Sequence, residues 1–433
     1  MSNSLDQLCE WYGVLPCYSD IWGNTRYTSD EAKRALLRAM RVPAATEEEI
    51  SASLLAFLKR KWERVLPPVQ VVREWTRPHR IAIILPVAED KLAYRWRLCR
   101  ESGAEDHGEF IPEGFEEVER YRFAASDGFG GLGAFNDPTG QEFVRRILVL
   151  DLHAEPGYHR FSIERGDGLC LAEMLFIVAP ATCYWPPGID GGKRVWGLAL
   201  QLYGIRSRRN YGIGDFSDLR RLVEFCANAG GSTLLLNPLH ALFPDAPEHT
   251  SPYSPSSRTW FNSLYLDVEA IPEFAECEEA RSIVLAPQFQ ARLRALRATE
   301  QVDYKGVAEA KSKVLACLYR HFRTAHLVQN TDRARAFRAF QSEHGETLRK
   351  QALFEALQEY FRAADSSVWG WPVWPEAYRD PGAPEVAAFC EAHLDRVEYF
   401  EYLQWQVSLQ LGSIGTRSWE VGLTVGLMFD LAI

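Results

Sequence analysis

A strand, a helix and a second strand follow one another between residues 195 and 239, and this order most constrains the fold of the chain. The segments "VWGLALQLYGI" (195–205) and "STLLLNPL" (232–239) are continuous apolar runs, typical of parallel strands covered on both faces. Between them, "DFSDLRRLVEFCANAGG" has apolar residues at helical spacing, with Asp215 as N-cap, Asp218 three residues later and Gly230–Gly231 as the stop. The pattern predicts a βαβ unit with a right-handed crossover.

A third apolar run, "VGLTVGLMFDLAI" (421–433), predicts a further buried strand, while residues from about 276 to 420 have mostly helical patterns. Residues 195–433 are close in number to the ~250 of a whole eight-stranded barrel, yet we find only three barrel-type strands in them. We therefore predict the start of an α/β (TIM-type) barrel, an incomplete (β/α)8 domain with a large helical insertion at about 276–420. A hydrophobic strand in last position needs partners, so we expect the chain to stop part-way through the barrel.

The N-terminal part of the chain has two further patterns, so we predict a multidomain protein. Residues 1–66 have apolar residues at helical spacing, with Ser29 and Thr46 as candidate N-caps. Residues 69–185 instead contain short β-branched and aromatic runs, such as "HRIAIILPV" and "RRILVLDL", separated by Gly, Asp and Pro clusters. Strands at this close spacing predict a β-sandwich-like domain that follows a helical N-terminal segment.

Charge and cysteine usage exclude several classes of partner and site. With 48 basic and 58 acidic residues the net charge is −10, which disfavours nucleic acid or an anionic membrane and suits a neutral substrate. The nine cysteines have no C-x-x-C spacing, which predicts reduced thiols and neither a disulfide framework nor a zinc site. The N-terminus has no signal-peptide pattern, and no window reaches ~18 uninterrupted apolar residues. We therefore expect a cytoplasmic protein.

Ligands of parallel α/β folds bind beyond the C-terminal ends of the strands, so the segments that follow the strands are the candidate site. The segment "YGIGD" (211–215) lacks the G-x-G-x-x-G spacing and a following Lys, which favours a tight turn over a phosphate loop. His240 has no second ligand at i+2 to i+4, which favours a hydrogen-bonding histidine over a metal ligand. The serines of 251–257 have no G-x-S-x-G elbow, which favours turn and capping roles over a nucleophile.

Hydroxyl groups and aromatic rings are concentrated after the second strand, in "SPYSPSSRTWFNSLYLD" (251–267). The stretch "WGWPVWPEAY" (369–378) adds three tryptophans on a proline-stiffened loop. Neutral donors and acceptors suit the hydroxyl groups of a sugar, and flat rings suit its C–H face. Both stretches therefore indicate a surface for a polyhydroxylated ligand, with core packing as the alternative role for each tryptophan.

At these residues the chain resembles the 4-α-glucanotransferases, the amylomaltases or disproportionating enzymes of glycoside hydrolase family 77. The resemblance is carried by "VWGLALQLYGIRSRRNYGIGDFSDL", "GGSTLLLNPLHALFP", "SPYSPSSRTWFNSLYLDV", "WPEAYRDP" and "GLMFDLA", and it extends over the whole chain. It implies transfer of α-1,4-glucan segments between maltooligosaccharides with retention, in starch, glycogen or maltodextrin metabolism, without a metal or organic cofactor. It also implies that Tyr253, Ser256 and Ser257 contact glucan, that Asp430 shapes the sugar site, and that Asn237 and Asp215 lie at the mouth of the barrel.

The resemblance departs from the family at the catalytic residues. A retaining enzyme needs a nucleophilic carboxylate and an acid/base carboxylate about 5–5.5 Å apart. In the family these residues lie on later strands, which we expect beyond Ile433, so this chain alone is expected to be inactive. Asp267, Glu269 and Glu376 match no catalytic position of the family, and we interpret them as structural. The alternatives are a non-catalytic glucan-binding protein and an α-glucan hydrolase of a related barrel type.

Overall fold

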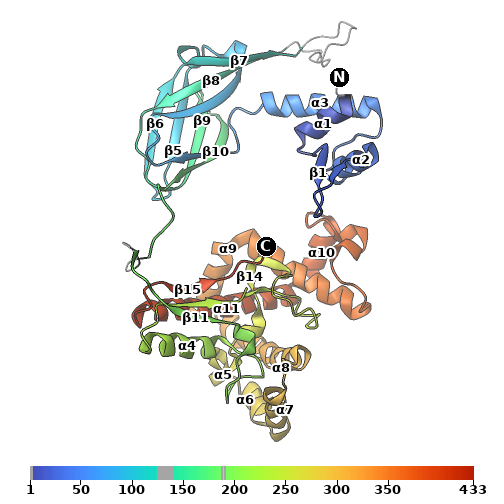
Figure 1. The fold of residues 1–433 in the computed structure, drawn as a ribbon, viewed down its shortest axis with the longest axis vertical. Helices are drawn as coiled ribbons and strands as arrows, with labels where there is room; N and C mark the ends of the chain where they lie inside the picture. Colours follow the sequence, from blue (N-terminus) through green and yellow to red (C-terminus); the bar gives the residue numbers. More distant parts are fainter. Residues whose placement is uncertain (1–2, 124–140, 187–188, 190–191) are drawn as a thin grey trace. The chain divides into compact units, whose positions relative to one another are not determined.

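The computed structural model describes residues 3–123, 141–186, 189 and 192–433, and it divides into two compact units, Met1–Tyr184 and Trp185–Ile433 (Figure 1). Residues 124–140 of the predicted β-sandwich region, and residues 1–2 of the helical region, therefore lie outside the described residues. Each unit has its own hydrophobic core. Among the described residues, no helix combines the length and the apolar character that crossing a membrane requires.

The first unit begins with helices and a short hairpin. The hydroxyl groups of Ser29 and Thr46 each accept a hydrogen bond from a backbone N–H three residues on, which confirms both predicted N-caps. The last helix of this part packs on the strands that follow, because the ring of Trp62 stacks on Tyr121 with centroids 5.1 Å apart. The elements are α1 (Ser4–Trp11), β1 (Cys17–Ser19), β2 (Thr25–Tyr27), α2 (Asp30–Ala39) and α3 (Glu47–Trp62).

Two sheets then form the predicted β-sandwich, in which alternate residues of β4, β5, β8, β9 and β10 are buried in a shared core. The larger sheet has the order β3-β10-β9-β5-β6 and the smaller one β4-β8-β7. Asp90 and Arg146 are buried together, with Nε–Oδ1 and Nη2–Oδ2 distances of 3.0 and 2.5 Å. The strands are β3 (Val69–Arg73), β4 (His79–Pro86), β5 (Tyr94–Cys99), β6 (Glu105–Phe110), β7 (Glu116–Arg122), β8 (Glu142–Leu150), β9 (Gly157–Arg165) and β10 (Cys170–Ala179), with 3-10 turns η1 (Val87–Glu89) and η2 (Pro112–Gly114).

The second unit contains a parallel sheet of the order β11-β12-β15, in which Leu198, Leu234 and Leu427 are aligned. These leucines face the helical core, where α4 and α11 pack on the strands. The next residues along β12 and β15, Leu235 and Met428, are 38% and 50% exposed. The prediction of strands covered on both faces was therefore wrong for these residues, because helices cover one face only. The elements are β11 (Gly197–Leu200), η4 (Leu202–Gly204), α4 (Phe216–Asn228), β12 (Thr233–Leu236) and β15 (Gly426–Phe429).

A hairpin and a set of helices lie in the chain between β12 and β15. Helix α9 is kinked at Gly345, whose φ of +50° is a left-handed value that glycine adopts without strain. The elements are β13 (His240–Ala241), β14 (Ser257–Phe261), η5 (Ser263–Tyr265), η6 (Val268–Ala270), α5 (Pro272–Glu276), α6 (Glu278–Leu285), α7 (Pro287–Ala298), α8 (Tyr304–Phe322), the π-helical turn η7 (Arg323–Leu327), α9 (Asp332–Ala364), η8 (Trp371–Val373), η9 (Glu376–Tyr378), α10 (Pro384–Ala392) and α11 (Leu394–Glu420).

Candidate functional site

Tyr253 and Asp430 meet where two neighbouring parallel strands end. Tyr253 lies in the loop that joins β13 to β14, in the segment after β12. Asp430 directly follows β15. The phenol Oη of Tyr253 donates a hydrogen bond to Asp430 Oδ2 at 3.0 Å. This bond to a carboxylate raises the pKa of Tyr253. The tyrosine is 57% exposed, so its ring remains available to a ligand.

The β13–β14 hairpin and its contacts hold this loop in place. Ser256 donates its backbone N–H to Ala241 O at 2.9 Å, and its hydroxyl donates to the carbonyls of residues 241 and 242. Ser257 begins β14, and its Oγ accepts a hydrogen bond from the N–H of Thr259 at 3.2 Å. Arg258 Nε donates to Ala432 O at 2.6 Å, which ties the hairpin to the segment that carries Asp430. The turn role that the sequence favoured for these serines is confirmed for Ser257, whose hydroxyl accepts from the N–H two residues on, whereas Ser256 bonds across the hairpin.

His240 joins the same segment through its ring. The N–H of Ala432 donates to His240 Nε2 at 3.2 Å, so the histidine forms a hydrogen bond, as predicted. Burial, together with the charge of Arg258, lowers the pKa of His240. The neutral ring is therefore the stable form, which fits its role as the acceptor of this bond.

A cavity of about 570 Å³ lies beside the hairpin, between β14 and helix α9. Trp369 and Trp371 line it and are exposed, whereas Trp374 is buried and donates its Nε1–H to Gln358 at 3.0 Å. The tryptophan loop is therefore divided between the cavity and the core. The lining combines hydroxyl, amide and aromatic groups, which suits a sugar: Phe243, Pro255, Ser256, Ser257, Thr259, Trp260, Thr347, Lys350, Gln351, Phe354, Trp369, Gly370, Trp371 and Pro372.

Asn237 and Asp215 lie in the interior, where their polar atoms are used by the protein. Asn237 Oδ1 accepts from the N–H of Leu202 at 2.8 Å, and its Nδ2 donates to Tyr265 Oη at 3.2 Å. Asp215 caps α4 by accepting from the N–H of Asp218 at 3.0 Å, and Asp218 accepts in return from the N–H of Asp215 at 3.3 Å. The predicted N-cap is confirmed. Both residues fix the segments that follow β11 and β12.

A buried group of charges that the sequence analysis missed lies around the start of α4. Arg209 contacts Asp215 and donates to Asp267 Oδ2 at 2.6 Å. Lys311 is fully buried and donates to the carbonyls of residues 264 and 266 at 2.6 and 2.7 Å. Burial lowers the pKa of Lys311 to about 8 and raises that of Asp215 to about 6, although the opposite charges nearby oppose both changes. Helical spacing marked Lys311 only as one position of an amphipathic helix.

Asp267, Glu269 and Glu376 differ in their surroundings. Asp267 accepts from Arg209 and from Ser217 Oγ, so the interpretation of this carboxylate as structural is confirmed. Burial, reinforced by Asp267, raises the pKa of Glu269. Glu376 is exposed in η9.

Together these features define a class of protein with a β-sandwich in one unit and, in the other, parallel strands whose ends carry a sugar-compatible site. The crystal structure of amylomaltase from Corynebacterium glutamicum has the same fold, with a TM-score of 0.71 and 24% identity over 99% of this chain and 55% of that chain. The 4-alpha-glucanotransferase family model matches residues 200–433, and the MalQ N-terminal beta sandwich domain matches residues 65–180. The chain belongs to the 4-alpha-glucanotransferase family, as the resemblance predicted.

Curated relatives give the same result. The chain is 33% identical over 297 residues to the 4-alpha-glucanotransferase of Haemophilus influenzae, a match that covers 68% of this chain and 42% of the relative. It is 32% identical over 448 residues to the 4-alpha-glucanotransferase of Mycobacterium tuberculosis strain H37Rv, which covers 100% of this chain and 56% of the relative. The chain thus spans about half the length of the curated relatives that it matches.

Proposed function

We propose that the protein takes part in the transfer of α-1,4-glucan segments between maltooligosaccharides with retention of configuration. Membership of the 4-alpha-glucanotransferase family supports the reaction class. We also propose that β11, β12 and β15 are consecutive strands of a (β/α)8 barrel domain over residues 195–433, with the helices of about 276–420 as an insertion. Their parallel pairing in chain order, with α4 as the crossover, supports this arrangement.

The Tyr253–Asp430 hydrogen bond is the observation that carries the proposal for the site. In α/β folds, ligands bind beyond the C-terminal strand ends, which is where this pair lies. An exposed aromatic ring beside a carboxylate offers a face for the C–H side of a glucose unit and an acceptor for its hydroxyl groups. We assign glucan contact to Tyr253, Asp430 and Ser257, and to Ser256 as an acceptor only, because its O–H donates within the hairpin.

Asn237 and Asp215 have a different role in this proposal. Their side-chain hydrogen bonds are made within the protein, so we assign them to positioning the strand-end loops. Their substitution is expected to weaken glucan binding only through displacement of those loops.

The catalytic pair is not among the carboxylates of the described site in our proposal. A nucleophile and an acid/base group about 5–5.5 Å apart must both reach the sugar. Asp215 and Asp267 are instead buried against Arg209, and Asp430 has Tyr253 as its partner. The 433-residue chain is therefore expected to bind glucan without turnover.

Incubation of the chain with maltotriose separates an active transferase and a hydrolase from a chain that binds glucan without turnover. Longer maltooligosaccharides together with glucose would identify a transferase whose catalytic pair lies within the chain, against our assignment of the carboxylates. A steady release of glucose without longer products would identify a hydrolase. Binding of maltotriose without any product is the expected result, and a binding protein without catalytic partners would give the same result for this chain.

Substitution of Tyr253 tests the site itself. We expect Tyr253→Phe to weaken maltoheptaose binding by ~5–10-fold, because the bond that holds Asp430 in place is lost and one hydrogen bond contributes ~1 kcal/mol. Tyr253→Ala, which also removes the ring face, is expected to weaken it further.

Binding would be measured by isothermal titration calorimetry, with Tyr158→Phe as the matched control, since Tyr158 is an exposed tyrosine of the first unit. Unchanged affinity in both Tyr253 variants would overturn the site assignment. Absence of maltoheptaose binding by the unsubstituted chain would overturn the proposed function of these residues altogether.

A further inference from the structure

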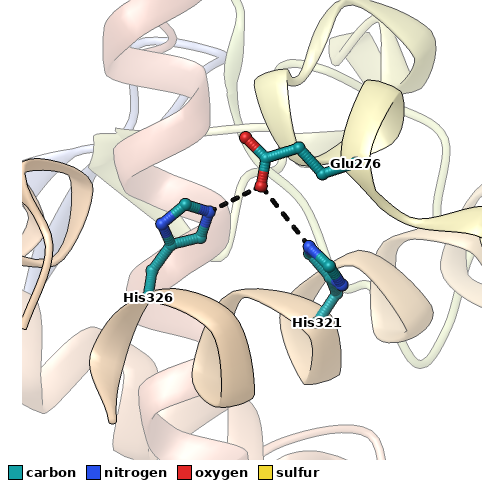
Figure 2. A group of neighbouring side chains, drawn as sticks. All are labelled: Glu276, His321 and His326. Atoms are coloured by element: carbon teal, nitrogen blue, oxygen red, sulfur yellow. Dashed lines mark hydrogen bonds and ion pairs between the residues drawn. The ribbon is translucent and has the colours of Figure 1, made fainter. Parts of the chain in front are cut away.

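Three side chains of types that bind metal ions converge among the helices of the second unit, outside the sugar-compatible site. Glu276 is the last residue of α5, His321 lies near the end of α8, and His326 lies in the π-helical turn η7. Figure 2 shows both imidazole rings on the side of their helix that faces the Glu276 carboxylate. Glu276 Oε2 is 2.8 Å from His326 Nε2 and 3.4 Å from His321 Nε2.

The π-helical turn explains how two histidines five residues apart share a face. In a regular α-helix, residues five apart point ~140° away from each other, because each residue turns the chain by ~100°. The turn from Arg323 to Leu327 is instead wound so that the N–H of Val328 bonds to Arg323 O at 3.1 Å, an i→i+5 bond. This local widening brings His326 round to the side of His321. Single π-turns inside α-helices frequently occur at functional sites.

We propose that Glu276, His321 and His326 bind a divalent transition-metal ion, with Zn²⁺ as the best fit. Two imidazoles and one carboxylate are a zinc ligand set, and tetrahedral bonds of ~2.0–2.2 Å place ligand atoms ~3.3 Å apart. The three ligand atoms already lie within 4.8 Å of one another. Small side-chain movements therefore suffice to surround an ion, and a fourth position is left for water.

Thr331 supplies the outer contact that metal-binding histidines commonly have. Its Oγ1 lies 2.9 Å from His326 Nδ1. When the Nδ1–H donates to this hydroxyl oxygen, the lone pair of Nε2 points at the other two ligands, as metal binding requires. The hydroxyl also caps α9, so its position is fixed by the fold.

The surrounding charges and exposure are compatible with an incoming cation. The nearest arginines along the helix are neutralised by ion pairs, Arg320 with Glu279 at 2.8 Å and Arg323 with Asp395. The side chains of Glu276, His321 and His326 are 47%, 26% and 12% exposed, so an ion can enter from solvent. A bound ion would fasten the end of α5 to the α8–η7 junction. We therefore assign the site a structural role.

Titration of the metal-free chain with ZnCl₂ in a calorimeter tests the proposal. We expect one ion per chain, and a loss of affinity of ~100-fold or more in His326→Ala and Glu276→Gln, since losing a ligand exceeds the ~10–100-fold effect of losing an outer partner. Glu278→Gln is the matched control, because Glu278 is an exposed glutamate two residues from the ligand. It is expected to bind like the unsubstituted chain.

Cobalt substitution gives a second measurement that needs no variant. Co²⁺ bound by this ligand set should give tetrahedral d–d absorption without the thiolate charge-transfer band that cysteine ligation produces. Thiolate bands would assign the binding to cysteines, such as the exposed Cys170 and Cys183, and would overturn the proposal. No Zn²⁺ binding, or equal affinity in the ligand variants and in Glu278→Gln, would also overturn it.

Discussion

Glu355 is buried in α9, where no cation of the described residues forms an ion pair with it, and this arrangement predicts a stability that falls as pH rises. The residue is 6% exposed, and Gln351 Nε2 donates to its Oε1 at 3.0 Å. Burial raises the pKa of Glu355 from its usual 4.5 to about 7; Asp245 contributes in the same direction, whereas Gln351 and Arg396 oppose it. In the folded protein, Glu355 therefore keeps its proton at pH values where the unfolded chain has lost it.

The sign and size of the effect follow from this pKa. Between pH 4.5 and about 7 the folded state binds more protons than the unfolded state, so the free energy of unfolding decreases as pH increases through this window. At ~1.4 kcal/mol per pH unit, the stability that Glu355 contributes at low pH is reduced by about 3 kcal/mol at pH 8. Glu355→Gln keeps the acceptor for Gln351 and cannot ionise. We expect the variant to match the unsubstituted protein near pH 4.5 and to be more stable at pH 8.

Urea unfolding followed by tryptophan fluorescence at several pH values would measure this difference, with Trp374 as a reporter in the same core. Glu343→Gln, at an exposed position of α9, is the matched control and is expected to show the pH dependence of the unsubstituted protein. A stability difference between Glu355→Gln and the unsubstituted protein that is the same at all pH values would refute the reasoning. So would a less stable variant at pH 8, because Glu355 would then be ionised and favourably paired.

Two further substitutions test the packing of each unit. Asp90→Ala removes the two-atom partner of the buried Arg146 guanidinium and leaves it Glu117 at 3.4 Å and the carbonyl of Phe115. We expect a loss of about 3 kcal/mol in thermal or urea unfolding, at the low end for a broken buried pair because Glu117 remains. The double variant with Arg146→Met should recover part of this loss, and an unrecovered double variant would contradict the charge argument. Gly212 has a φ of +90°, and a Cβ there would lie 2.8 Å from Leu296 Cβ, so Gly212→Ala should destabilise the second unit by about 1–3 kcal/mol. Gly204→Ala, where a Cβ meets nothing within 4 Å, is its control, and equal effects of the two would contradict the predicted strain.

The parts of the fold that depend on local signals could be predicted from the sequence. The cap at Asp215 was predicted because the cap residue and Asp218 lie on one turn of helix, and the structure contains both reciprocal bonds. The strands β11, β12 and β15 were likewise predicted from a local signal, an apolar run in each of these segments. Which face of these strands is covered depends on where helices distant in the chain pack, so the exposure of Leu235 and Met428 had no local signal.

The candidate site was predictable residue by residue but not as an arrangement. The family resemblance indicated Tyr253 and Asp430 separately, while their contact depends on β15 lying beside β12. The convergence of Glu276, His321 and His326 was missed because a spacing of five is not a helical contact unless a π-turn intervenes. The hydrogen bonds from Lys311 to the carbonyls of residues 264 and 266 could not be predicted either, because these residues are more than 40 positions away in the chain and only the fold brings them together.

The Tyr253–Asp430 contact also affects when the site can form during protein synthesis. Its two partners are 177 residues apart in the chain, and the Thr233 Oγ1–Gly426 O bond that accompanies β12–β15 pairing joins residues 193 apart. At ~5–20 residues per second, a ribosome needs roughly 10–35 s to deliver Asp430 after Tyr253 has been added. Throughout this interval the hydroxyl-rich loop exists without the carboxylate that orients it. Glucan affinity at this site is thus expected to arise only after β15 and Asp430 have been synthesised.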